Sequence, residues 1–138
     1  MDNLDEDYEI IFINDCSQDD SLMKITEICE KNKKIKGISL RRNFGYNNAI
    51  MAGIKYACGE IIILMDDDLQ HNPADIPCLI NSLKRGSDVC YANFTSMQQS
   101  WFKKFGSWLN GIIANLIINK PKDLYLSSFK AIKREIID

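Results

Sequence analysis

A run of aliphatic residues that ends in consecutive aspartates is the feature that most constrains the fold of this chain. Residues 61–73 read I-I-I-L-M-D-D-D-L-Q-H-N-P. An uninterrupted aliphatic run of this length suits a strand that is buried on both faces of a parallel sheet, and α/β proteins bind ligands at the carboxyl ends of such strands. We therefore expect the aspartates at the edge of a ligand-binding cleft.

The carboxylates of Asp66, Asp67 and Asp68 repel one another unless a cation lies between them. Oxygen ligands of this kind suit a hard divalent cation, Mg²⁺ or Mn²⁺, that bridges to a phosphorylated ligand. In extended chain alternate side chains share one side, so Asp66 and Asp68 can bind one ion while Asp67 points to the other side. The alternative is an acidic turn before a helix, whose N-terminus is stabilised by negative charge.

Composition narrows the class of protein. A chain of 138 residues with 46% hydrophobic residues suits one domain with a full core. With 17 basic and 19 acidic residues, the net charge of -2 gives no electrostatic reason to expect a nucleic-acid partner. No uncharged apolar run reaches the length needed to span a bilayer. The five cysteines have no paired metal spacing, which indicates reduced, buried thiols of a cytosolic protein.

Strand and helix patterns alternate along the chain. Helix patterns follow the first three of the predicted strands, which lie at residues 8–13, 35–40, 61–65 and 89–91. This order predicts an α/β fold with a mostly parallel sheet, right-handed crossovers and flanking helices.

The carboxyl ends of parallel strands meet at one edge of the sheet, so three separate loops are expected to converge. Asp15 follows the first strand, Arg41 and Arg42 follow the second, and the aspartates follow the third. A carboxylate can accept hydrogen bonds from a base or ribose, and an arginine can bind a phosphate. Taken singly, Asp15 can be a turn residue and Arg42 a solvated charge; together they indicate a nucleotide site.

Several segments resemble the inverting GT-A glycosyltransferases of family 2, and most closely the subgroup that transfers a sugar from a nucleotide donor to a polyprenyl phosphate. The similarity runs over nearly the whole of residues 1–138. It is carried by N-D-C-S-Q-D at 14–19, R-N-F-G at 42–45, M-D-D-D-L-Q-H-N-P at 65–73, S-W-F-K-K at 100–104 and S-S-F-K-A-I-K-R at 127–134.

The resemblance implies a role for individual residues. The donor is expected to be a UDP- or GDP-sugar and the acceptor a lipid phosphate or a glycan, with Mg²⁺ or Mn²⁺ as cofactor. The family commonly has arginine where this chain has Lys130, and glycine where it has Cys16. The expected metal ligands are Asp66, Asp68 and Gln70; the nucleotide-sugar site comprises Asp15, Arg42, Asn43 and Asp66; Lys103 and Lys130 would meet the acceptor phosphate.

The resemblance also implies a mechanism. An acceptor phosphate oxygen attacks the anomeric carbon from the face opposite the leaving diphosphate and inverts the configuration. A lipid phosphate is already anionic at neutral pH, so a strong general base is not needed. Asp67 or Asp68 would serve as the base if the acceptor is a sugar hydroxyl, while His71 is expected to line the loop.

The chain departs from the family at both ends. The family opens with a strand and a P-x-Y-N-E type loop ahead of the N-D-C-S position, and this subgroup carries transmembrane helices after the catalytic domain. We therefore expect a truncated GT-A domain of doubtful activity that lacks the first strand, which in the family lies between the strands ending at Asn14 and Asp66. Loss of a central strand favours pairing with a second copy.

Residues 100–118 combine Trp101, Trp108 and aliphatic residues with Lys103 and Lys104. Such a helix can lie in the membrane interface beside a polyprenyl acceptor, which would place the full-length protein in the cytoplasm at the inner face of the cell membrane. The alternative is an ordinary amphipathic helix packed on the sheet.

Two other functions remain open. A phosphoacceptor receiver domain also has acidic residues after strand one and a central strand, but its phosphorylated aspartate is solitary, unlike the triplet here. The chain could also be an inactive fragment that only binds a partner.

Overall fold

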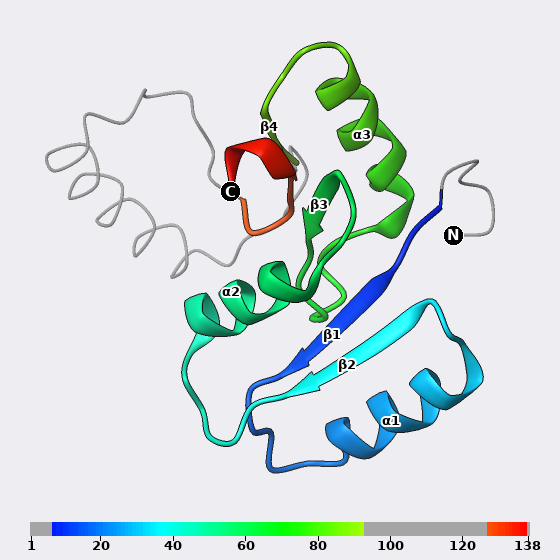
Figure 1. The fold of residues 1–138 in the computed structure, drawn as a ribbon, viewed down its shortest axis with the longest axis vertical. Coiled ribbons are helices and arrows are strands. Elements are labelled where there is room, and N and C mark those ends of the chain that lie inside the picture. The colour runs from blue at the N-terminus through cyan, green and yellow to red at the C-terminus, as the bar shows by residue number, and fades with distance from the viewer. Residues whose placement is uncertain (1–6, 93–126, 138) are drawn as a thin grey trace, which may run out of the picture.

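The alternation of strands and helices predicted from the sequence is confirmed in the computed structural model, which describes residues 7–92 and 127–137 (Figure 1). In addition to the helices and strands, there are short 3₁₀ turns at Pro73–Asp75 and Arg134–Ile136. The elements in order are β1 (Ile10–Asn14), α1 (Ser21–Lys31), β2 (Ile35–Ser39), α2 (Tyr46–Tyr56), β3 (Ile61–Leu64), α3 (Ile76–Lys84), β4 (Val89–Tyr91) and β5 (Lys130–Lys133).

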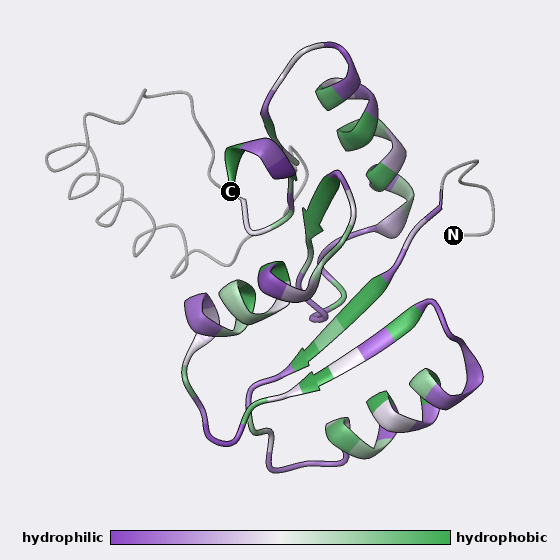
Figure 2. Cartoon of the chain, in the orientation of Figure 1, coloured by the Kyte–Doolittle hydropathy of each residue, from purple (hydrophilic) through white to green (hydrophobic). Residues whose placement is uncertain are grey.

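The first sheet pairs β1 with β2 in parallel, from Ile10 opposite Ile35 to Asn14 opposite Ser39. Helix α1 packs on this pair through Ile25 and Cys29, and the approach is so close that a Cβ on Gly37 would lie 2.6 Å from Cγ2 of Ile25. On β1 itself packs α2, where Gly53 lies against the Ile13 side chain. The hydrophobic residues of β1 and β3 and one side of each helix stand out in Figure 2.

The second sheet has the order β3-β5-β4, and β5 runs antiparallel to both neighbours. The sequence patterns did not predict β5, which lies between β3 and β4, two strands that themselves run in the same direction. Phe129 and Ala131 explain its place, because both side chains are fully buried under α3. The core of this half consists of Ile76, Leu79, Leu83, Ala92, Phe129 and Ala131.

Within the described residues no backbone pairing joins β1 to β3. Hydrogen bonds from Ile10 N to Lys34 O and from Leu40 N to Asn14 O turn alternate peptide groups of β1 toward β2. The peptide groups of Ile11 and Ile13 therefore point to the opposite edge, and the sheet of β3 lies on that side in Figure 1. No strand of the described residues pairs with this edge of β1, and a strand between β1 and β3 stays a prediction from the family resemblance.

Contacts outside the ladders connect the two sheets. The Glu9 carboxylate, at the start of β1, accepts hydrogen bonds from Lys36 Nζ and from the backbone N–H of Cys58, ahead of β3. The hydrogen bond from Lys36 and then that from Cys58 lower the pKa of Glu9. From the other side, the Arg134 guanidinium donates to the carbonyls of Ala57 and Gly59.

The prediction that the cysteines are buried is wrong, although all five are free thiols as expected. Cys58 and Cys78 are exposed and the other three are half-buried. No helix in the described part of the chain is long and apolar enough to cross a membrane.

Replacement of Gly37 by alanine is expected to lower the free energy of unfolding by about 1–3 kcal/mol, because the new Cβ would overlap Ile25. Without that contact, alanine in a strand would be stabilising by about 0.5–1 kcal/mol, so the sign of the change is informative. Urea unfolding measures it. In an Ile25→Ala background the cost should shrink, since Cγ2 is gone. Stabilisation by Gly37→Ala in the otherwise unchanged chain would contradict this packing.

Candidate functional site

The acidic residues lie on a loop beyond the end of β3. The strand ends at Leu64, and the chain bends at residues 67–69, so the strand geometry from which we inferred a shared side for Asp66 and Asp68 does not extend to them. Asp66 is half-buried, whereas Asp67 and Asp68 are exposed. The Asp68 side chain accepts a hydrogen bond from the backbone N–H of Gln70 at 3.0 Å. The orientation of each carboxylate therefore depends on contacts within and around the loop.

Asp66 has two such contacts. Its Oδ1 accepts a hydrogen bond from the Tyr46 hydroxyl at 3.1 Å, and its backbone N–H donates to Nδ1 of His71 at 3.0 Å. Tyr46 is the first residue of α2, so this pair connects the acidic loop to the start of that helix. Partial burial of the hydroxyl, followed by the hydrogen bond to Asp66 and the charge of Asp66, raises the pKa of Tyr46 and keeps the phenol a donor at neutral pH.

The acidic loop is also attached to the start of β5. The His71 ring stacks on Phe129 with centroids 5.1 Å apart, and its Nε2 lies 3.3 Å from Oγ of Ser128. Lys130 follows on β5, where it is paired with Leu64 and with Tyr91, and its Nζ lies 5.7 Å from the centre of the Tyr91 ring. Lys130 thus lies beside Leu64, the last residue of β3, which precedes Asp66 by two residues.

Three residues expected at the nucleotide site meet ahead of α2. Both oxygens of Asp15 accept backbone hydrogen bonds at 2.8 Å, one from Phe44 and one from Gly45. The Asn43 side chain accepts from the same Gly45 N–H at 3.0 Å. The Arg42 guanidinium lies 4.7 Å from the centre of the Phe44 ring and is exposed.

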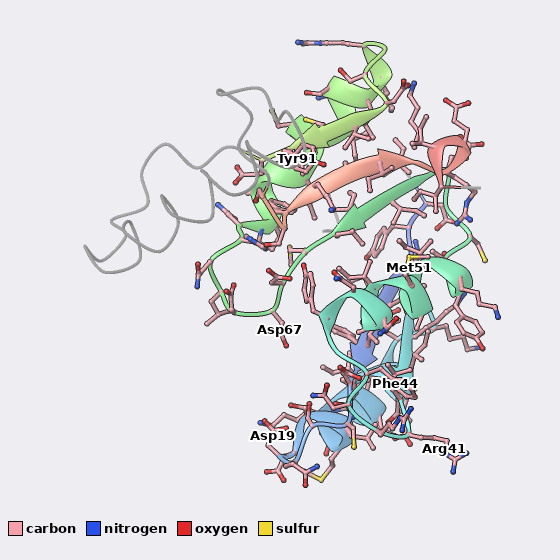
Figure 3. The ribbon with its side chains drawn as sticks, turned by 90° about the vertical axis from the view of Figure 1, so that its left-hand side faces the viewer. Asp19, Arg41, Phe44, Met51, Asp67 and Tyr91 are labelled. Carbon is pink, nitrogen blue, oxygen red and sulfur yellow. The ribbon has the colours of Figure 1, made fainter. Side chains whose placement is uncertain are left out.

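These contacts bring the expected loops together around the first turn of α2. Figure 3 shows Asp67 at the exposed acidic loop and Phe44 on the loop that leads into the helix, while Arg41 extends into solvent on the other side. Lys103 and the expected helix at residues 100–118 lie outside the described residues. Sequence reasoning missed Tyr46 and Ser128, the partners of Asp66 and His71. Tyr46 follows R-N-F-G and Ser128 lies within S-S-F-K, two segments that carry the family resemblance, which was the available signal.

The turn after β1 is unusual in its backbone. Cys16 has φ +62°, in the left-handed region that favours glycine, which the family commonly has at this position. The buried Asn14 side chain accepts a hydrogen bond from the Ser17 N–H at 3.1 Å and closes the turn around Cys16. The turn in this way directs Asp15 toward the 42–45 loop.

The acidic loop has the kind of ligand that a divalent cation prefers, but its described residues do not form a complete coordination shell. Asp66 and Asp68 supply hard carboxylate oxygens, and no lysine or arginine within the described ranges pairs with the aspartates at 66–68. The same residues contain no group of three or more ligating side chains placed to hold an ion. Mg²⁺ is commonly bound by one or two carboxylates together with substrate phosphates. The arrangement fits that mode.

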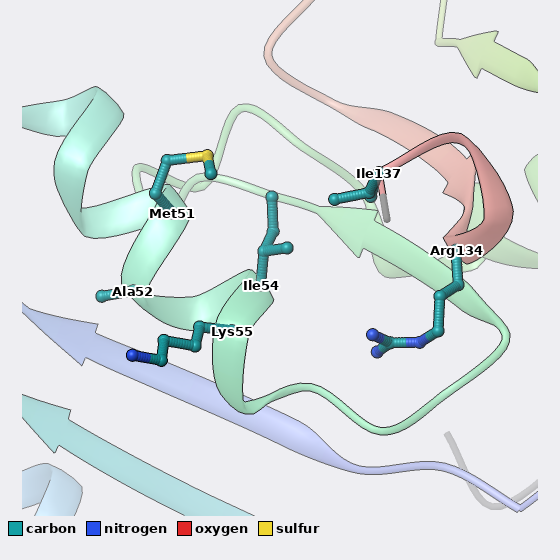
Figure 4. Close-up of a pocket in the computed structure, with 6 residues that line it drawn as sticks. All are labelled: Met51, Ala52, Ile54, Lys55, Arg134 and Ile137. Carbon is teal, nitrogen blue, oxygen red and sulfur yellow. The ribbon is translucent and has the colours of Figure 1, made fainter.

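A separate hollow of about 580 Å³ lies at the other end of α2, lined by Met51, Ala52, Ile54, Lys55, Arg134 and Ile137 (Figure 4). Its arginine is committed to the carbonyls of Ala57 and Gly59, and the rest of its lining is mostly apolar. The hollow is therefore not suited to a diphosphate.

With this geometry in place, comparison with known proteins gives the family. The family model of glycosyl transferase family 2 matches residues 2–138, and the chain belongs to this family. Membership favours a transferase over a receiver domain.

Curated relatives agree with the family. The chain is 36% identical over 142 residues to an undecaprenyl-phosphate 4-deoxy-4-formamido-L-arabinose transferase of Aeromonas hydrophila subsp. hydrophila, covering 99% of this chain and 42% of the relative. It is 35% identical over 136 residues to a transferase of the same name from an Enterobacter species, covering 98% and 42%. The chain thus spans less than half the length of these relatives.

Solved structures share the fold at low sequence identity. One is titled only as a mycobacterial protein, with a TM-score of 0.68, 17% identity, and coverage of 93% of this chain and 43% of that one. Another is glucosyl-3-phosphoglycerate synthase from Mycobacterium tuberculosis in complex with UDP, with a TM-score of 0.67, 16% identity, and coverage of 91% and 46%. The predicted GT-A fold is confirmed.

The strain at Cys16 can be tested by stability. Cys16→Val is expected to unfold at a free energy about 1–2 kcal/mol lower than Cys16→Gly, because a β-branched residue is poorly tolerated at positive φ. The matched control is the exposed Cys78 on α3, where the order should reverse because glycine is the poorer helix former. Equal stability of the two Cys16 variants in urea unfolding would contradict the assigned backbone conformation.

Proposed function

We propose that this chain is part of the catalytic domain of a glycosyltransferase that moves a sugar from a nucleotide donor to a polyprenyl phosphate with inversion. The observation that carries the proposal is the meeting of Asp15, the 42–45 loop and Asp66 at the start of α2. The names of the curated relatives support undecaprenyl phosphate as the class of acceptor.

The donor nucleotide lies along the loops after β1 and β2 in this proposal. A carboxylate has about four lone-pair directions, so Asp15 retains acceptor capacity for a base N–H after binding Phe44 and Gly45. Arg42 contacts Phe44 through the face of its guanidinium, which leaves edge N–H groups for a phosphate. Asn43 flanks the donor while its side chain holds the loop.

Asp66, Asp68 and Gln70 would hold Mg²⁺ or Mn²⁺ with the donor diphosphate. When bound, the cation supplies Lewis-acid stabilisation of the charge on the leaving diphosphate. Tyr46 donates to one Asp66 oxygen and leaves the other for binding. The chain's own part in this step is to orient two carboxylates that no lysine or arginine of the described residues neutralises.

The acceptor phosphate approaches from the side of β5. Lys130 lies beside the end of β3 and would attract the phosphate as a point charge, with Lys103 as the second expected contact. For a sugar-hydroxyl acceptor, the exposed Asp67 or Asp68 would instead serve as the base. The edge of β1 that no described strand pairs supports the view that residues 1–138 are part of a larger GT-A domain, or associate as homo-oligomers through that edge.

Cation and nucleotide are expected to strengthen one another's binding, because the acidic loop alone is incomplete. Calorimetry with Mn²⁺ and UDP, and separately GDP, measures this. Asp68→Asn should weaken binding of the pair by about tenfold or more, corresponding to ~1.4 kcal/mol. Asp7→Asn removes the same charge at a remote, 95% exposed position and should leave binding unchanged. If both variants weaken binding equally, Asp68 contributes only its negative charge and is not a ligand of the cation.

The acceptor class predicts membrane binding through residues 100–118. The chain should sediment with vesicles that contain anionic lipid at low salt, because Trp101, Trp108 and the neighbouring lysines suit the membrane interface. The Trp101→Ala, Trp108→Ala double variant should stay mostly in the supernatant, whereas Tyr56→Ala, at an exposed tyrosine of α2, should sediment as before. If the folded wild-type chain does not sediment with these vesicles, the result would favour a glycan acceptor.

A further inference from the structure

The hydrogen bonds around Asp66 form a network, here called the circuit, that connects α2, the acidic loop and the start of β5. Asp66 N–H donates to His71 Nδ1, His71 Nε2 contacts Ser128 Oγ, and the Tyr46 hydroxyl donates to Asp66 Oδ1. The Ser128 side chain also acts on the Tyr46 phenol and lowers its pKa, against the larger effects of burial and of Asp66, which raise it.

The chemistry of the groups fixes the direction of these three hydrogen bonds. A backbone N–H only donates, so Nδ1 of His71 accepts and carries no proton. The proton of the neutral ring is then on Nε2, which donates to Ser128 Oγ. The phenol proton of Tyr46 goes to the carboxylate of Asp66, which only accepts. Asp66 thus donates through its backbone and accepts through its side chain.

We propose that Tyr46, His71 and Ser128 are positioning residues for Asp66: they fix its backbone and its Oδ1, turn Oδ2 toward the ligand, and couple the acidic loop to the strand that carries Lys130. This inference rests on the proposed function for its ligand, Mn²⁺ with a nucleoside diphosphate. A carboxylate held at one oxygen and at its own backbone presents the other oxygen without further loss of rotational freedom on binding.

The circuit is better suited to orientation than to stability. The Tyr46 side chain is 55% exposed, so loss of its hydroxyl should cost the fold little. The ring of His71, by contrast, is held on the fully buried Phe129, which gives the circuit a rigid base. Variants at Tyr46 therefore separate positioning from folding.

The first test reads the circuit directly and needs no ligand. His71 is the only histidine of the chain, so the side-chain nitrogen signals of a ¹⁵N-labelled sample are assigned without further work. At a pH of about 8, where an ordinary histidine is neutral, the ring is expected in the Nε2–H tautomer. The Nδ1–H tautomer would overturn the circuit, because it cannot accept the Asp66 N–H.

The second test measures positioning through binding of Mn²⁺ with UDP by calorimetry. Tyr46→Phe and Ser128→Ala are each expected to weaken binding of the pair by about tenfold, the lower end of what loss of a ligand's hydrogen-bond partner costs. Tyr56→Phe is the matched control: it removes a hydroxyl from the last residue of the same helix, at a tyrosine that is 59% exposed against 55% for Tyr46, and it should bind as the wild type does. Melting temperatures of all variants should agree.

The two tests separate failure of this inference from failure of the proposed function. Wild-type binding with no loss in Tyr46→Phe would overturn positioning and leave the proposed function intact. A wild-type chain in the Nε2–H tautomer that binds neither Mn²⁺ nor UDP would overturn the proposed function and, with it, the positioning role, while the circuit itself would stand as a structural one.

Discussion

The start of helix α2 is the point on which the rest of the site depends. Its preceding turn is held by Asp15, whose carboxylate accepts the N–H groups of Phe44 and Gly45, and its first residue, Tyr46, donates to Asp66. A helix N-terminus has N–H groups without intrahelical partners. Here the carboxylate of Asp15, from another loop, accepts the N–H groups of the two residues directly before the helix. Because these hydrogen bonds join residues that are far apart in the sequence, they bring the ends of β1, β2 and β3 into one region.

The division of the sheet makes those bonds more important. No ladder in the described residues joins β1 to β3, so backbone pairing does not transmit position from one half to the other. The halves are connected instead by α2 packed on β1, by Glu9 at Cys58 and by Arg134 at the loop after α2.

Backbone strain marks the loops that carry the chemistry. Cys16 and Leu69 are the non-glycine residues with positive φ in the described parts of the chain, at φ +62° and +63°. Cys16 follows Asp15 directly, and Leu69 lies between Asp68 and Gln70. Such conformations persist where surrounding bonds determine them, as the Asn14 and Asp68 side chains do here. The strained turns redirect the chain so that carboxylates leave the strand ends at defined angles.

Hydrophobic periodicity was enough to predict the alternation of strands and helices, and the resemblance of several short segments was enough to predict the GT-A fold and the family, because both are local signals that one sequence carries. The sequence also indicated Asp15, Arg42 and Asp66 as members of one region. The position of β5 between β3 and β4 could not be predicted in this way, because it depends on the burial of Phe129 and Ala131, which is a property of packing in the folded chain. The same holds for the contacts around Asp66: Tyr46 lies 20 residues from Asp66 and Ser128 lies 57 residues from His71, so these hydrogen bonds exist only once the fold has set the separation and direction of the groups.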